Sequence, residues 1–178
     1  MIVRVVPYDT RWPAQYEAEA RRIRDAVDDV GVRIHHIGST AVPGLRAKPI
    51  IDILLEVSDL AALDARSHRL EALGYEAKGE FGIPGRRYFR RDNELGVRTH
   101  QVHAFVAGGP QADRHLAFPD YLISHPEVAQ AYGDLKRELA ERFPSDIDAY
   151  MDGKDSFVKR FEAEALAWRS TRIASSCS

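Results

Sequence analysis

The feature that most constrains the fold is the segment from Ile50 to Val57, which reads IIDILLEV and is apolar at six of its eight positions. A run this apolar is typical of a strand inside a sheet and not at its edge. On such a strand Asp52 shares one face with Leu54 and Glu56, and the opposite, wholly aliphatic face is the core face. An unpaired carboxylate costs several kcal/mol to desolvate. Asp52 therefore needs a partner.

The loop before this strand, IGSTAVPGLRAK, offers partners of two kinds. Gly38 lets the backbone approach a ligand closely, and Ser39 and Thr40 add hydroxyls to a run of amides suited to an anion. In this interpretation Asp52 holds a metal or cation beside a phosphate site. In the alternative interpretation Asp52 caps the loop or pairs with Lys48 and has only a structural role.

The rest of the chain alternates between helical and extended patterns. Apolar residues at spacings of three and four predict a helix between residues 9 and 31, another over 58–74, and further helices after residue 109. Two β-rich arms around DNELG predict a hairpin within residues 78–106. This order predicts an α+β fold, with a small mixed sheet flanked by helices. We expect one domain over residues 1–170 and a flexible C-terminal tail over 171–178.

Composition narrows the class of protein without naming its ligand. The chain has 178 residues, of which 44% are hydrophobic and 29% charged, and its formal net charge is −2. These values are typical of a soluble globular protein. The single cysteine, Cys177, excludes an internal disulfide framework, and with no signal peptide or membrane span expected we predict a cytoplasmic protein. No broad basic face with interleaved aromatics appears, so nucleic acid is not an expected partner.

Four separated motifs resemble one known family. YDTRWPAQY, HIGSTAVPGLRAKPIIDILLEV, HLAFPDYLISHPEVAQAYGDLKREL and YMDGKDSFVKRF occur in the order found in the GrpB family, a bacterial group within the nucleotidyltransferase superfamily. The resemblance runs from about Val6 to Phe161, and it extends to a domain fused to dephospho-CoA kinase in some bacteria. It implies a nucleotidyltransferase-like fold, in which a Gly-Ser pair binds a triphosphate and two carboxylates one residue apart hold Mg²⁺.

The sequence matches this template only in part. Gly38, Ser39 and Asp52 occupy template positions, but Leu54 stands where the second carboxylate is expected. Glu56 cannot replace it, because residues four apart on a strand lie about 13 Å apart, whereas paired metals lie about 3.5–4 Å apart. A standard two-metal site is therefore incomplete, and Mg²⁺ or another divalent cation would need other ligands.

Histidines are the other candidate ligands. Of those near the predicted strands, His35, His36, His100 and His103 could reach Asp52. His100 and His103 point to opposite faces of a regular strand, and the apolar neighbours of His100 favour His103 as the one beside Asp52. Asp52 and His103 are therefore the predicted catalytic and metal-binding pair. The alternative is a histidine hydrogen-bonded at a strand edge.

Two further cations are candidates for an anion site. GRRYFRRD has arginines on both faces of a strand, which indicates either a solvated edge or a phosphate clamp that uses Arg87. Lys154 lies in a helical stripe of aromatic residues and must extend to solvent or meet an anion. We expect Arg87 and Lys154 to line one site with Lys48 and the Gly-Ser loop.

Three functions follow from these residues. The first is a nucleotidyltransferase-like enzyme that transfers a nucleotidyl group from a nucleoside triphosphate to an unidentified acceptor. The second is a non-catalytic domain that binds a nucleotide, a CoA-like molecule or another anion. The third is a metal-dependent enzyme of different chemistry built on Asp52 and His103. The sequence predicts no oligomeric state.

Overall fold

The computed structural model describes residues 2–177, and within them five strands form one mixed sheet in the order β1-β2-β5-β4-β3. The elements follow the chain as α1 (Trp12–Ala26), β1 (Arg33–Ile37), the 3-10 helix η1 (Ser39–Ala41), β2 (Ile51–Val57), α2 (Leu60–Asp64), α3 (Ser67–Glu71), β3 (Glu76–Ala77), β4 (Arg87–Asp92), β5 (Arg98–Val106), α4 (Pro110–Ser124), α5 (Pro126–Arg142) and α6 (Ile147–Ser176). The predicted α+β fold with a small mixed sheet is confirmed.

The strand β2 lies inside the sheet, as its apolar sequence predicts. It pairs antiparallel with β1 and parallel with β5, and β5 pairs antiparallel with β4 to form the predicted hairpin. β1 and β5 provide hydrogen-bond partners for the backbone amides and carbonyls of β2 on both sides. A strand with mostly apolar side chains is therefore stable inside the sheet.

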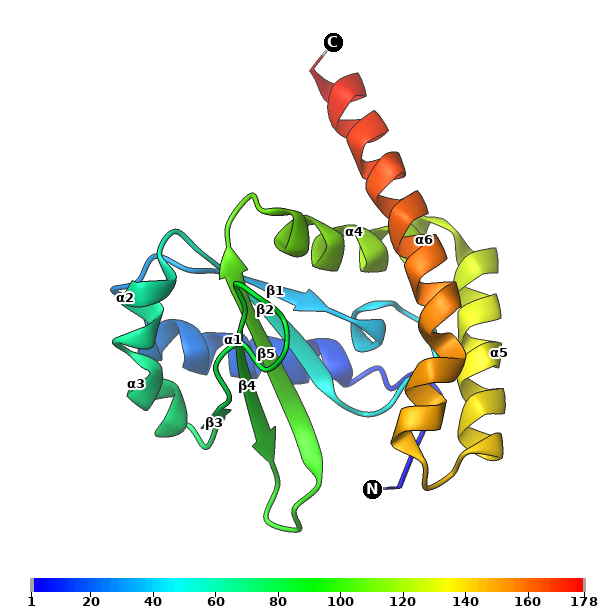
Figure 1. Ribbon diagram of the computed structural model, residues 1–178, viewed down its shortest axis with the longest axis horizontal. Coiled ribbons are helices and arrows are strands. Elements are labelled where there is room, and N and C mark those ends of the chain that lie inside the picture. The colour runs from blue at the N-terminus through cyan, green and yellow to red at the C-terminus, as the bar shows by residue number, and fades with distance from the viewer. Residues whose placement is uncertain (1, 178) are drawn as a thin grey trace.

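The main hydrophobic core lies on one face of the sheet. Ile51, Ile53 and Leu55 of β2 pack there with Ile23 of α1 and Leu63 of α2, and all five are buried. In Figure 1, α1 passes behind the sheet, α4 runs along its upper edge and α6 stands to its right. The predicted assignment of the core face of β2 is confirmed.

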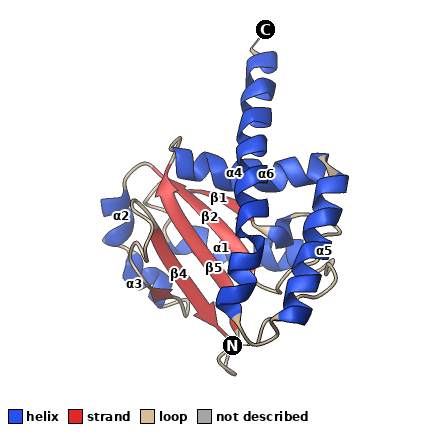
Figure 2. Cartoon of the chain, turned by 45° about the vertical axis from the view of Figure 1, so that its right-hand side comes forward, coloured by secondary structure: helices blue, strands red, loops and turns tan. Residues whose placement is uncertain are grey.

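The other face of the sheet is only partly covered. Leu54 packs there with Phe105 of β5 and Ala112 of α4, and Figure 2 shows α6 standing across the front of the strands, with α5 beside it. This side of the sheet, between the strands and the two late helices, is where the polar residues of β2 and β5 face. The fold thus leaves one face available for a site.

Two segments differ from the sequence predictions. The helix predicted over 58–74 is two short helices, α2 and α3, separated at residues 65–66. The segment from 171, predicted as a flexible tail, continues α6 to Ser176, and hydroxyls of Thr171 and Ser176 bond back to carbonyls one turn earlier. The end of α6 projects from the rest of the molecule (Figure 1). Among the described residues, no helix combines the length and apolar character needed to cross a bilayer.

A buried polar network ties α1 to the sheet and generates a prediction about stability. The Tyr75 hydroxyl and the Arg91 guanidinium each donate a hydrogen bond of 2.8 Å to the buried carboxylate of Glu19. Tyr75→Phe should lower the free energy of unfolding by about 1.5–3 kcal/mol, the range for a lost bond to a charged group. Tyr16→Phe is the matched comparison, because the Tyr16 hydroxyl donates to a neutral carbonyl, that of Ile34, at 3.1 Å. Tyr16→Phe should lower the free energy of unfolding by less than Tyr75→Phe does. An equal or larger decrease for Tyr16→Phe, measured by urea denaturation, would contradict the stabilising role of the Glu19 network.

Candidate functional site

The Gly-Ser turn and Asp52 lie directly against each other. Gly38 ends β1 with a φ of 73°, a conformation that favours glycine, and a Cβ atom added there would lie 2.8 Å from Oδ2 of Asp52. The register of the sheet explains this contact, because Ile37, the residue before the turn, is paired with Asp52. Glycine is therefore required at position 38 both by its backbone conformation and by the carboxylate beside it.

The structure brings His103 to the same carboxylate. The parallel pairing of β2 with β5 places His103 opposite Leu54, on the face of Asp52, and His103 Nε2 lies 3.3 Å from Asp52 Oδ1. The other ring nitrogen, Nδ1, is buried and has no hydrogen-bond partner among the described residues. His100 lies on the opposite face, where its ring contacts Arg91.

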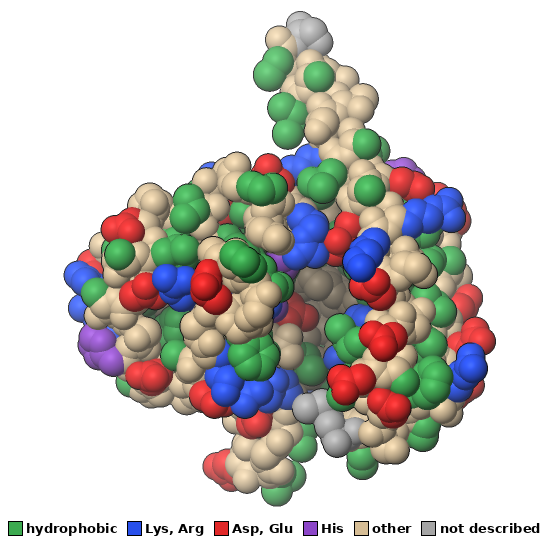
Figure 3. Space-filling model, in the orientation of Figure 1, with side chains coloured by type: hydrophobic (Ala, Val, Ile, Leu, Met, Phe, Trp, Pro, Cys, Tyr) green, Lys and Arg blue, Asp and Glu red, His purple; other side chains and the backbone are tan. Residues whose placement is uncertain are grey.

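Three lysines from different elements meet beside Asp52. Lys48 comes from the loop after η1, Lys136 from α5 and Lys154 from α6, and together they line a cavity of about 150 Å³. The other residues that line it are Ser39, Thr40, Ala47, Ile50, Asp52, Gln101, Tyr150 and Met151. The space-filling view shows a hollow between the sheet side of the molecule and α6, with Lys and Arg side chains at its rim (Figure 3).

Aromatic rings hold these lysines in place. The Nζ atoms of Lys48 and Lys154 lie 5.6 Å and 5.5 Å from the centre of the Tyr150 ring. Lys136 Nζ lies 4.4 Å from the centre of the Tyr132 ring. Such contacts stabilise a cation by about 0.5–2 kcal/mol, which is less than burial of an unpaired ammonium group costs. The rings therefore orient the lysines without neutralising them.

Lys136 is the most exceptional of the three. Its exposed fraction is 2%, and within residues 2–177 its Nζ atom has no hydrogen-bond partner. Burial, with added repulsion from Lys154 and Lys48, holds the pKa of Lys136 well below its usual range. Burial also lowers the pKa of Lys48 and of Lys154, and Asp52 partly opposes the effect at both. A charge this costly in the free protein is typical of a group that meets an opposite charge in a complex.

The two hydroxyls of the Gly-Ser turn have different surroundings. Ser39 lines the cavity. Thr40 also lines the cavity. Its buried hydroxyl lies 2.9 Å from Nε2 of His36, and the His36 ring stacks on Tyr16. Burial lowers the pKa of His36 to about 4, so this pair is neutral at neutral pH. The Thr40 side chain thus holds the turn to the core, whereas the Ser39 hydroxyl lines the cavity and is hydrogen-bonded to the hydroxyl of Tyr132.

Arg87 does not join the site, and its predicted place there is wrong. Arg87 is paired with Ala104, which belongs to the main core, so its side chain lies on the opposite face of the sheet from Asp52. Its guanidinium donates hydrogen bonds of 2.6 Å and 3.0 Å to the carboxylate of Asp64 in α2. It is Tyr88, paired with His103, that faces the cleft from β4.

Among the described residues, this face offers no second accessible carboxylate beside Asp52 for a two-metal site. Leu54 is fully buried beneath α4, so the template position of the second carboxylate is closed to solvent. Glu56 is also buried and is bound to Arg33 at 3.0 Å and to His35 at 2.7 Å. No group of three or more His, Cys, Asp or Glu side chains in the described part of the chain could hold a metal ion. A metal here would be held by Asp52 together with oxygens of a ligand.

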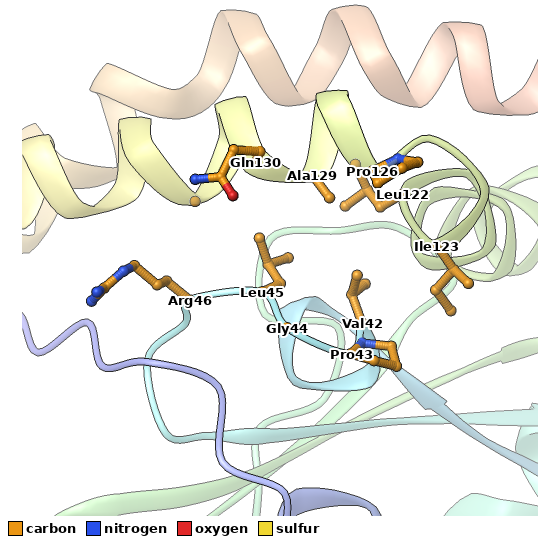
Figure 4. A pocket seen from close by; sticks show the side chains of 11 residues that line it. Val42, Pro43, Gly44, Leu45, Arg46, Leu122, Ile123, Pro126, Ala129 and Gln130 are labelled. Atoms are coloured by element: carbon orange, nitrogen blue, oxygen red, sulfur yellow. The ribbon is translucent and has the colours of Figure 1, made fainter.

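A second hollow lies on the other side of the loop after η1. It has a volume of about 340 Å³ and is lined by Val42, Pro43, Gly44, Leu45, Arg46, Leu122, Ile123, Pro126, Ala129, Gln130 and Gly133. Figure 4 shows these side chains, with the loop facing the corner between α4 and α5. A Cβ atom on Gly133 would already lie 3.4 Å from Leu45, so this seam sets how closely α5 approaches the loop. The lining is mostly apolar and carries no set of catalytic groups, and the site is therefore assigned to the lysine cavity.

Comparison with known proteins identifies the family of this chain. A family model described as "GrpB protein" matches residues 2–164. The chain belongs to the GrpB family. A relative in Bacillus subtilis, "UPF0157 protein YqkA", is 41% identical over 96% of this chain and 49% of its own length. This GrpB-family chain thus spans about half the length of that relative.

Two solved structures and one enzyme complete the comparison. The crystal structure of GrpB from Enterococcus faecalis has a TM-score of 0.88 at 42% identity and covers 93% of this chain and 99% of that one. The Cid1 poly(U) polymerase with bound MgGTP has a TM-score of 0.54 at 14% identity and covers 76% of this chain and 44% of Cid1, so it shows likeness of fold alone. "Dephospho-CoA kinase" of Mycolicibacterium paratuberculosis is 32% identical over 93% of this chain and 46% of its own length.

Sequence reasoning missed Lys136 and Tyr150 as site residues. Lys136 follows Tyr132 by four residues and precedes Leu139 by three, so a cation lies in the buried stripe of α5. The same signal pointed to Lys154, and it could have identified Lys136. Tyr150 belongs to a buried core cluster, and its ring is also the surface on which two of the lysines lie.

The buried lysine generates a prediction about stability and pH. The pKa of Lys136 is lower in the folded than in the unfolded state, so its positive charge destabilises the fold. The destabilisation is complete at pH values below the folded-state pKa. It disappears as pH rises toward the ordinary lysine pKa of about 10.4. Lys136→Met should therefore raise the free energy of unfolding at pH 7 by about 1–4 kcal/mol. It should also flatten the rise of stability between pH 7 and pH 10, measured by chemical denaturation.

Lys159→Met is the control for that experiment. Lys159 is exposed on α6 and pairs with Asp155 at 2.7 Å, so its removal should change stability by no more than about 0.5 kcal/mol. If Lys136→Met instead lowers the free energy of unfolding and leaves its pH dependence unchanged, the charge of Lys136 is already balanced by a partner within the fold.

Proposed function

We propose that this chain binds the phosphate chain of a nucleoside triphosphate in the lysine cavity, with Mg²⁺ held between the phosphates and Asp52. The observation that carries the proposal is the buried ammonium group of Lys136, which has no hydrogen-bond partner among residues 2–177 and shares its cavity with Lys48 and Lys154. A multiply charged anion supplies the missing partner of Lys136 and attracts Lys48 and Lys154 at the same time. Charge-assisted bonds of this kind are about twice as strong as neutral ones.

The balance of charge in the cavity favours a polyanion over a neutral ligand. Three lysines and one carboxylate, Asp52, line it. An anion replaces mutual repulsion between the lysines by attraction and so opposes the effect of burial, which is the main cause of their lowered pKa values. A neutral ligand would remove water from the lysines without any such gain.

The size of the cavity indicates which part of the ligand enters it. Sites that enclose a whole drug-sized molecule have volumes of roughly 300–1,000 Å³, whereas this cavity has about 150 Å³. It therefore receives the phosphates, and the nucleoside extends along the open face of the sheet. Ser39, the first residue of η1, lines the cavity, and in this proposal its hydroxyl donates to a phosphate oxygen, as the Gly-Ser pair does in the superfamily that GrpB resembles.

A divalent cation fits this arrangement only together with the ligand. Mg²⁺ is usually bound through one or two carboxylates plus substrate phosphates and water. Asp52 supplies one such carboxylate, and its contact with Gly38 keeps it at the Ser39 end of the cavity. When bound, Mg²⁺ would neutralise phosphate charge. The fold likeness to Cid1, whose structure carries MgGTP, supports the choice of ligand.

Nucleotidyl transfer is the second candidate function, and the contact between Asp52 and His103 favours it. A histidine beside a carboxylate is a common general-base pair, but here Nε2 faces Asp52 at 3.3 Å and Nδ1 is buried, so proton transfer from an attacking hydroxyl would require one of these nitrogens to become accessible. The buried Leu54 argues against the usual two-metal form of this reaction. Binding is therefore the main proposal, and transfer would require His103 to act in place of a second metal.

Calorimetric titration with ATP, in the presence and absence of Mg²⁺, tests the proposal. Lys136→Met and Lys154→Met should each weaken binding by about 10–100-fold, the equivalent of one lost charge-assisted bond of about 1.5–3 kcal/mol. Asp52→Asn should keep binding to metal-free ATP and lose the additional affinity that Mg²⁺ provides. Lys159→Met, on the exposed side of α6, is the control and should bind as the parent protein does.

Two outcomes would contradict the proposal. If Lys136→Met and Lys154→Met bind ATP as tightly as the parent protein, the phosphates do not occupy the lysine cavity. If the parent protein binds no nucleoside triphosphate at low ionic strength, where such contacts are strongest, the three lysines serve another ligand.

A further inference from the structure

The loop between β3 and β4 presents an aromatic ring to solvent in an unfavourable backbone conformation. Phe81 has a φ of 47°, and among the described residues it is the only one other than glycine with a positive φ. Its exposed fraction is 55%. A single exposed apolar residue is ordinary, but a bulky side chain in the left-handed region is rare and costs free energy. Ease of the turn does not account for a phenylalanine here, and the contacts of its ring within the fold are with Tyr88 and with the ammonium group of Lys78, 5.6 Å from the ring centre.

The loop is held in this conformation by several hydrogen bonds. The buried guanidinium of Arg86 donates to the carbonyl of Glu80 at 3.1 Å and to that of Phe81 at 2.7 Å. The amide of Gly85 donates to the carboxylate of Glu80, and Ile83 packs against the core beneath α4. The strained position of Phe81 is therefore a fixed feature of the loop.

A row of rings connects Phe81 to the lysine cavity. Phe81 stacks on Tyr88, with ring centres 5.3 Å apart and planes at 21°. Tyr88 lies 5.4 Å from the ring of His103, and His103 contacts Asp52, which lines the cavity. The exposed Phe81 ring is thus at the outer end of a row whose inner end is the phosphate site.

We infer that Phe81, supported by Tyr88, is a stacking subsite for the base of the nucleoside triphosphate whose phosphates occupy the lysine cavity. The inference rests on the proposed function and adds the contact that separates a nucleotide from a simple polyphosphate. Stacking of a base on an aromatic side chain tolerates any base, because every base has a π-face. The subsite therefore predicts selection for a nucleoside without strong preference for one base.

Comparing ATP with inorganic tripolyphosphate by calorimetry tests this subsite. The parent protein should bind ATP more tightly than tripolyphosphate. Phe81→Leu keeps an apolar side chain but removes the π-face, and it should weaken ATP binding about tenfold, equivalent to about 1.4 kcal/mol, with less than about a twofold change for tripolyphosphate. Phe81→Tyr keeps the ring and should restore ATP binding to within about twofold.

Controls separate failure of this inference from failure of the proposed function. Leu95→Ala changes another exposed apolar residue, in the β4–β5 turn, and should alter neither affinity. Lys136→Met should weaken both ligands. If tripolyphosphate binds but Phe81→Leu binds ATP as the parent protein does, the stacking subsite is wrong and the phosphate site stands. If the parent protein binds neither ligand, both are wrong.

Discussion

The pairing of β2 with a different strand on each side is the constraint on which the site depends. On one side the antiparallel pairing with β1 brings the Gly38 turn against Asp52, and on the other the parallel pairing with β5 brings His103 to the same carboxylate. A shift of either register by one residue would move Asp52 to the core face. The aliphatic face of β2, packed on α1 and α2, fixes the register because any other would expose it.

The late helices add positive charge to this sheet at a cost in stability. α5 and α6 supply Lys136 and Lys154, and Lys48 approaches from the loop after η1, so three like charges share a small cavity. Aromatic rings orient the lysines, but their lowered pKa values show that the fold does not compensate the charges fully. Binding sites typically lower the stability of the free protein in this way, because the bound ligand then stabilises the protein. The same reasoning applies to Phe81, whose backbone has a positive φ although its ring is only partly buried against Tyr88.

Much of the fold and part of the site were predictable from the sequence. The apolar run over residues 50–57 identified β2 as an interior strand, and the two β-rich arms around DNELG identified the hairpin, because both signals are local in the sequence. The choice of His103 over His100 to face Asp52 followed from alternation along one strand. Lys154 was found as a cation in an apolar stripe, and Lys136 could have been found by the same argument.

Arg87 shows where such reasoning fails. Arginines occupy both faces of β4, so the sequence alone cannot say which face meets the cleft, and that choice depends on the register between β4 and β5. The partner that holds Arg87, Asp64, lies 23 residues earlier in the chain and belongs to a helix on the other face. Likewise, the burial of Leu54 beneath α4 depends on how the helices pack, which no local pattern reports.

The central claim is that Lys136 is a buried, uncompensated cation that an anion completes. Its pKa can be measured directly by an NMR titration of lysine side chains, assigned with Lys136→Met, in the presence and absence of tripolyphosphate. The account predicts a pKa well below the ordinary lysine value in the free protein and a rise on addition of tripolyphosphate. An ordinary pKa in the free protein, or a lowered pKa that tripolyphosphate leaves unchanged, would contradict it.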